Sequence, residues 1–111
     1  MEQEKTIPFK KEMRRLAGIA YQREMDSELN EIYKEFKKWE KGEIDCFKLN
    51  DIIYKYHDEI ARYLWKINLM KTDYLTARGI AKNIIKNEEV NPKLKVYLKD
   101  KIEYIKNEIG V

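Results

Sequence analysis

The sequence predicts an all-α fold, a small bundle of about four helices built on a long antiparallel helical hairpin. Apolar residues recur at spacings of three and four along most of the chain, which is the period of one helix face. Only four glycines and two prolines occur in 111 residues, so few positions disfavour a helix. The length fits one helical domain over residues 1–111.

The hairpin is predicted from the first two helices. The first is expected to begin at Thr6 and to end at Gly42, because glycine is common just after a helix. The second is expected over residues 45–68, with Asp45 as its N-cap. The short connection folds it back antiparallel on residues 25–39. The apolar side of this second helix comprises Leu49, Ile52, Ile53, Tyr56, Ile60, Tyr63, Leu64 and Ile67.

Two shorter helices are expected to complete the bundle. One begins near Thr72 or Asp73 and ends at the segment "NEEVNP"; it is expected to bury Ala77, Ile80, Ala81, Ile84 and Ile85. Asn91 then caps the last helix, with Pro92 in its first position. One face of that helix comprises Leu94, Leu98, Ile102, Ile105 and Ile109.

Two apolar stripes divide the first helix. The earlier stripe comprises Phe9, Met13, Leu16 and Ala20, and the later one Met25, Leu29, Ile32, Phe36 and Trp39. At 100° per residue the stripes lie roughly 150–200° apart, so one straight helix cannot present both to one neighbour. Either the chain bends between Gly18 and Ser27, or the two halves pack against different neighbours, one of them a second subunit. We favour the second alternative, in which residues 1–24 are an extension or a dimerisation segment.

Composition excludes several classes of site. With one cysteine, Cys46, and one histidine, His57, the chain has no internal disulfide and no zinc site, and no cofactor is expected. No apolar run approaches the roughly 18 residues of a membrane span, so we expect a cytoplasmic protein that does not enter a membrane. The abundance of Lys, Glu, Ile and Tyr indicates a heat-loving source or an AT-rich genome.

The histidine stands in the segment "YHDEIARYLWK" beside three charged residues. On a regular helix these side chains point in different directions, and Asp58 and Arg62 form a surface pair four residues apart. His57 is expected at the margin of the apolar face beside Tyr54, Ala61 and Trp65, which form a second, partly apolar strip. We interpret it as a hydrogen-bonded packing residue, with catalysis or ligand binding as the alternative.

A basic face accompanies the earlier stripe. It comprises Lys10, Lys11, Arg14 and Arg15. Such an amphipathic segment is suited to phosphate binding, and therefore to a nucleic acid, whereas a solvated outer face over a buried stripe is the structural alternative.

A stripe of acidic residues runs beside the later apolar stripe, and its members are spaced four, three and four residues apart. It comprises Glu24, Glu28, Glu31 and Glu35. Carboxylates in such a row can hold Mg²⁺, as in all-helical nucleotide hydrolases. The alternative is a solvated face or one paired with lysines of a neighbour.

The run "FKKWEKGEIDCFKLNDIIYKYHDEIARYLWK" resembles a group of small, uncharacterised helical prokaryotic proteins. The matching positions are Trp39, Gly42, Ile44, Leu49, Ile53, His57 and Arg62, and the likeness covers about residues 25–98. It departs at Glu59, where that group commonly has glycine. The resemblance implies a helical hairpin and carries no activity.

These observations favour a non-enzymatic interaction or scaffold protein. We expect a homodimer that buries Phe9, Met13, Leu16 and Ala20, or binding to another helical protein. A nucleic-acid-binding accessory that uses the basic face is the first alternative. A Mg²⁺-dependent nucleotide hydrolase that uses the acidic stripe is the second.

Overall fold

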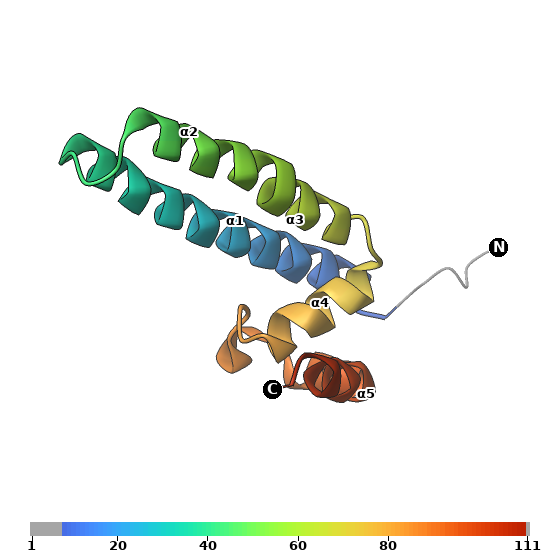
Figure 1. Ribbon diagram of the computed structural model, residues 1–111. Coiled ribbons are helices and arrows are strands. Elements are labelled where there is room, and N and C mark those ends of the chain that lie inside the picture. Colours follow the sequence, from blue (N-terminus) through green and yellow to red (C-terminus); the bar gives the residue numbers. More distant parts are fainter. Residues whose placement is uncertain (1–7, 111) are drawn as a thin grey trace. The chain divides into compact units, whose positions relative to one another are not determined.

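The computed structural model describes residues 8–110, and in that part of the chain it contains helices and no strands (Figure 1). The elements are α1 Lys10–Glu40, α2 Cys46–Lys55, the π-helical segment η2 Tyr56–Ala61, α3 Arg62–Ile67, α4 Thr72–Ala81, the 3-10 turn η3 Asn87–Glu89 and α5 Pro92–Ile109. Because α2, η2 and α3 follow one another without a break, they form one helical rod. The all-α fold with four helices is therefore confirmed. The predicted helix start at Thr6 lies outside the described residues.

Contacts between residues divide the chain into two compact units. The terminal unit combines the described residues up to Tyr21 with the chain from Met70 onward, and the hairpin unit is Gln22–Leu69. Helix α1 contributes to both, since the boundary falls inside it. Folding of the whole chain as a single domain stays a prediction.

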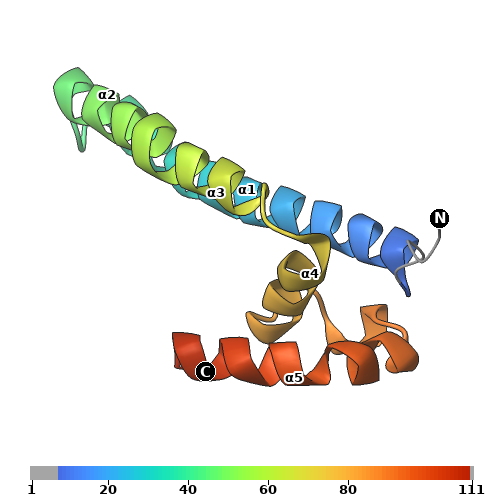
Figure 2. The same ribbon diagram turned by 90° about the vertical axis from the view of Figure 1, so that its right-hand side faces the viewer.

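The terminal unit has a well-filled core. Its central members are Met13, Leu16, Ala20, Ala77, Ala81, Ile85, Val90, Leu94, Leu98, Ile102 and Ile105. Within this unit α4 packs on α5 at a steep angle, since α5 is seen nearly end-on in Figure 1 and along its length in Figure 2.

The predicted N-cap and first residue of the last helix, α5, are confirmed. Asn91 accepts a hydrogen bond from the N–H of Lys93 at 2.8 Å, and Pro92 is the first helical residue.

The end of α4 corrects the sequence prediction. The helix stops at Ala81, so Ile84 and Ile85 lie in the following turn rather than in the helix. Asn83 takes the left-handed conformation, at φ 63°, which asparagine adopts more readily than most residues. The N–H of Ile84 then donates to the carbonyl of Gly79 at 2.8 Å. This turn brings Ile85 back into the core, where it is buried.

The hairpin unit consists of the second half of α1 and the α2–η2–α3 rod, which run antiparallel side by side in Figure 1 and overlap in Figure 2. The two are in contact, since residues of both line one groove. Gly42 ends α1 at φ 76°, and the N–H of Glu43 donates to the carbonyl of Lys38 at 2.9 Å. Asp45 caps α2 by accepting from the N–H of Lys48 at 2.8 Å. The predicted cap and C-terminal glycine of the hairpin are thus confirmed.

The π-helical segment η2 was not predicted. It replaces a regular turn at Tyr56–Ala61, and it widens the helix so that residues four apart stay nearly in line.

None of the described helices is both long enough and apolar enough to cross a membrane.

Candidate interaction surface

The earlier apolar stripe of α1 does not face a partner. Met13, Leu16 and Ala20 are buried in the core of the terminal unit, and Phe9 packs against that core with its ring 5.6 Å from the ring of Tyr97. The prediction that this stripe meets a second subunit is therefore wrong, because α4 and α5 of the same chain supply the covering side chains. For the same reason residues 8–21 are part of a core and not an extension.

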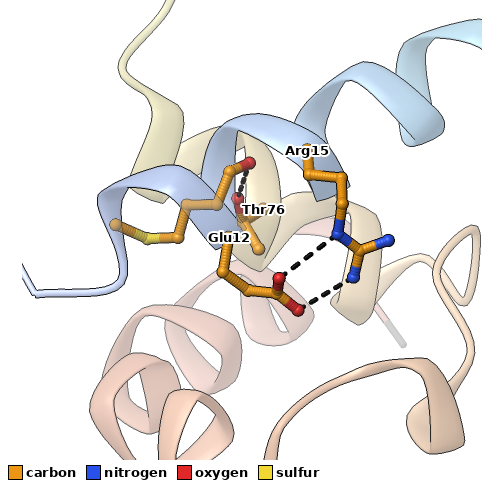
Figure 3. A network of polar contacts seen from close by, with 4 residues as sticks. Glu12, Arg15 and Thr76 are labelled. Atoms are coloured by element: carbon orange, nitrogen blue, oxygen red, sulfur yellow. Dashed lines mark hydrogen bonds and ion pairs between the residues drawn. The ribbon is translucent and has the colours of Figure 1, made fainter.

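The two halves of α1 do pack against different neighbours, as expected, but both neighbours belong to the same chain. Helix α1 is unbroken between Gly18 and Ser27, and its two halves pack in different units. A threonine fixes the first half to α4. The hydroxyl of Thr76 lies 3.1 Å from the carbonyl oxygen of Met13 (Figure 3). It also lies 2.8 Å from the carbonyl oxygen of Thr72. Sequence reasoning missed this contact, since a threonine inside a helix carries no pattern of its own.

The basic face lies on the exposed side of α1. Lys10, Lys11, Arg14 and Arg15 are all exposed. Figure 3 shows that Arg15 is held by Glu12, whose carboxylate accepts from Nε at 3.2 Å and from Nη2 at 2.9 Å. This hydrogen bond and the charge of Glu12 raise the pKa of Arg15. The charge of Arg15 is thus partly compensated, which leaves three cations without a partner among the described residues.

The acidic stripe lines a groove on one side of the hairpin. The groove has a volume of about 360 Å³, and its walls carry Glu28, Glu31 and Glu35 from α1 and Lys48 and Lys55 from α2. Its apolar members are Ile32, Ile52, Tyr56 and Ile60.

Two of these glutamates already have lysine partners on their own helix. Glu31 contacts Lys34 at 3.0 Å, and Glu35 contacts Lys38 at 3.1 Å. Within residues 8–110 no three Asp, Glu, His or Cys side chains lie close enough together to hold a metal ion. Glu24, the fourth member of the stripe, does not line the groove. Lysines of the same helix therefore neutralise part of the acidic stripe.

The later apolar stripe faces the second helix only in part. Met25 and Ile32 are half-buried, as are Glu28 and Glu35, whereas Leu29 and Phe36 are exposed. The side of α1 that faces the second helix therefore includes Glu28 and Glu35, and the part of the apolar stripe with Leu29 and Phe36 points away from that helix. The same holds on the rod, where Leu49 and Leu64 are buried while Ile53 and Tyr63 are exposed.

Helical geometry places the exposed apolar residues on the side opposite the groove. On α1, Glu31 and Tyr33 lie 100° to either side of half-buried Ile32, and Glu31 lines the groove. On the rod, Tyr63 and Trp65 flank buried Leu64 in the same way.

We call the set on the far side the aromatic face. It comprises Leu29, Tyr33, Phe36, Ile53 and Trp65. These side chains are between 38% and 57% exposed. Sequence reasoning placed Leu29, Phe36 and Ile53 against the opposite helix and therefore missed the face. The partial signal was the second strip beside His57, which includes Trp65.

His57 lies on the rod between Ile53 and Ala61, and four-residue spacing puts the three on one side of the helix. It is exposed and makes no hydrogen bond to another described residue. The interpretation of His57 as a hydrogen-bonded packing residue is therefore not met in this part of the chain. The predicted pair is confirmed, because Nη2 of Arg62 lies 3.5 Å from Oδ1 of Asp58.

The chain was compared with protein families, with curated proteins and with solved structures, and nothing matches in any of the three.

Proposed function

We propose that this is a non-enzymatic interaction protein that binds an apolar helical surface through its aromatic face. The observation that supports the proposal is the composition of that face. Leu29, Tyr33, Phe36, Ile53 and Trp65 are large apolar side chains gathered on one side of a two-helix hairpin, and each is more than a third exposed. Large exposed apolar side chains gathered on one side of a molecule often mark an interaction site.

The distribution of charge supports the same function. The groove side of the hairpin carries Glu28, Glu31, Lys48 and Lys55, which water solvates well. The aromatic face lies on the other side and has tyrosine, tryptophan and phenylalanine, the residues enriched at protein interfaces. A hairpin with one charged, solvated side and one apolar side is suited to bind a partner through the apolar side.

Photo-crosslinking in the native cell tests this proposal. A benzophenone amino acid replaces Tyr33 in one variant and Tyr63 in the other. Both tyrosines belong to the hairpin unit and are 57% exposed, but they lie on opposite sides of it. We expect position 33 to give an adduct that peptide sequencing maps to an apolar helix of another molecule, whether a second copy or a different protein. Adducts formed only within single molecules, or equal adducts from both positions, would contradict the proposal.

A second candidate function is nucleic-acid binding. Lys10, Lys11 and Arg14 are exposed on one stretch of α1 and have no partner among the described residues, which supports phosphate contacts. Retention on DNA or RNA should then fall steeply with salt and should be lost when the three become Gln. Absence of retention at low salt would remove this candidate.

A further inference from the structure

We infer that the aromatic face is covered by the aromatic face of a second copy of the chain, so that two hairpins form a four-helix bundle. The inference rests on the proposed function and adds the identity of the partner. It also replaces the predicted dimer contact at Leu16 with a surface in the other unit of the chain.

The first argument is that the hairpin has no complete core of its own. Among its described residues only Leu49 and Leu64 are buried, although α1 and the rod are both amphipathic. Two helices alone can shield only one narrow strip of each other. Four helices enclose a core, which is why antiparallel hairpins commonly pair into four-helix bundles. A second hairpin supplies the two missing helices.

The second argument is the area available. Given the exposed fractions of its five members, the aromatic face offers roughly 500 Å² per chain, since large apolar side chains bury about 150–250 Å² each. Two copies would bury about 1,000 Å² in total, about the smallest area at which a specific protein interface is expected. The face is thus just large enough for a dimer, and a weak one is expected.

The third argument is charge. In a twofold contact the centre of the surface meets its own copy, so a charge there would be repelled by itself. On α1 the aromatic face has one charged neighbour, Lys37, whose Nζ lies 4.5 Å from the centre of the Tyr33 ring, and no acidic side chain lies on this side of the helix between Asp26 and Glu40. On the rod, Cys46, Asn50 and His57 lie on the same side as Ile53, at three- and four-residue spacing, and none of them is acidic, Lys or Arg. Apart from Lys37 the centre of the face is therefore neutral, which favours a second copy over a highly charged partner.

Sedimentation velocity of the full chain tests the inference with a matched pair of variants. Tyr33→Glu adds a charge on the aromatic face, and Tyr63→Glu adds the same charge at a tyrosine of equal exposure, 57%, on the other side. We expect a monomer–dimer equilibrium for the parent chain between about 1 µM and about 1 mM, the range suited to a small interface. Tyr33→Glu should weaken association by more than about tenfold, because it removes an apolar ring from the contact and puts in its place a carboxylate that would have to leave water. Tyr63→Glu should associate like the parent.

Circular dichroism shows whether each variant stays helical. If Tyr33→Glu unfolds, Trp65→Lys on the same face takes its place, and the mass of the parent chain decides in any case. A parent that remains monomeric throughout the range overturns the inference. If that monomer still gives an adduct with a different protein from position 33, only the inference fails. If position 33 gives no adduct with another molecule, the proposed function fails with it.

Discussion

The hydroxyl of Tyr56 donates a hydrogen bond to Sδ of Met25 at 2.9 Å. This contact joins the π-helical segment η2 to α1, and both side chains are half-buried. It lies across the contact between α1 and the rod, where it links residues 31 positions apart in the sequence.

Removing that hydroxyl should weaken the hairpin slightly. Tyr56→Phe keeps the ring and loses the donor, so the free energy of unfolding should fall by about 0.5–1 kcal/mol, the lower part of the range for one hydrogen bond because a thioether is a weak acceptor. Urea unfolding followed by tryptophan fluorescence measures this change, since Trp39 and Trp65 both lie in the hairpin unit. Tyr63→Phe, at an exposed tyrosine, is the control and should unfold like the parent. Equal losses of unfolding free energy in Tyr56→Phe and Tyr63→Phe would show that the hydrogen bond to Met25 does not contribute to stability.

Leu16 should behave as a core residue and not as an interface residue. Its side chain is 1% exposed within a single chain. Leu16→Ala should therefore lower the free energy of unfolding by about 2–5 kcal/mol, the cost of a cavity in a packed core. Leu16→Glu should unfold the terminal unit rather than separate a dimer. Denaturation followed by circular dichroism measures both changes, with exposed Lys11→Ala as control. A folded Leu16→Glu variant with parental stability would show that the residue is not buried.

The two helical glycines should respond oppositely to alanine. At Gly79 an added Cβ would lie 2.6 Å from Cδ1 of Ile85 and 3.2 Å from Cβ of Ala20, whereas at Gly18 it would meet nothing within 4 Å. Both changes gain about 1 kcal/mol of helix propensity, but Gly79→Ala also incurs about 1–3 kcal/mol of overpacking. Thermal unfolding should show a raised midpoint for Gly18→Ala and a lowered one for Gly79→Ala. Equal increases would mean that Ile85 does not pack on Gly79.

The cap of α2 should contribute measurably to the hairpin. Asp45→Ala removes the acceptor of the Lys48 N–H and should cost about 1 kcal/mol. Asp45→Asn keeps an oxygen in the same place and should retain most of the stability. The midpoints of urea unfolding compare the two. If the alanine and asparagine variants unfold alike, the hydrogen bond is not the source of the stabilisation.

Local signals in the sequence predicted the helices well. Asp45, Asn91 and Gly42 act through their own backbone and nearest neighbours, so a cap or a left-handed glycine can be recognised without knowing the fold. The end of α4 was missed because Ile84 and Ile85 continue the helical spacing, and a single asparagine is a weaker stop signal than glycine. The π-helical segment carries no signal in the sequence at all.

The spacing of apolar residues predicted which side chains form stripes suited to burial, but not which element covers them. Phe9, Met13 and Leu16 form an apolar stripe whether a second subunit or the same chain covers them. Only the course of α4 and α5 shows that the same chain does. Likewise Leu29 and Phe36 share a stripe with Ile32, yet a rotation of α1 leaves them exposed. The aromatic face results from this rotation, which depends on how two whole helices pack.

Thermal unfolding of the full chain at different protein concentrations tests the central claim, that a second copy covers the aromatic face. Association stabilises the folded state by mass action, so the unfolding midpoint of a dimer depends on concentration. We predict a midpoint that rises with concentration for the parent and for Tyr63→Glu, and one that stays constant for Tyr33→Glu. A constant midpoint for the parent over the whole range would contradict the account.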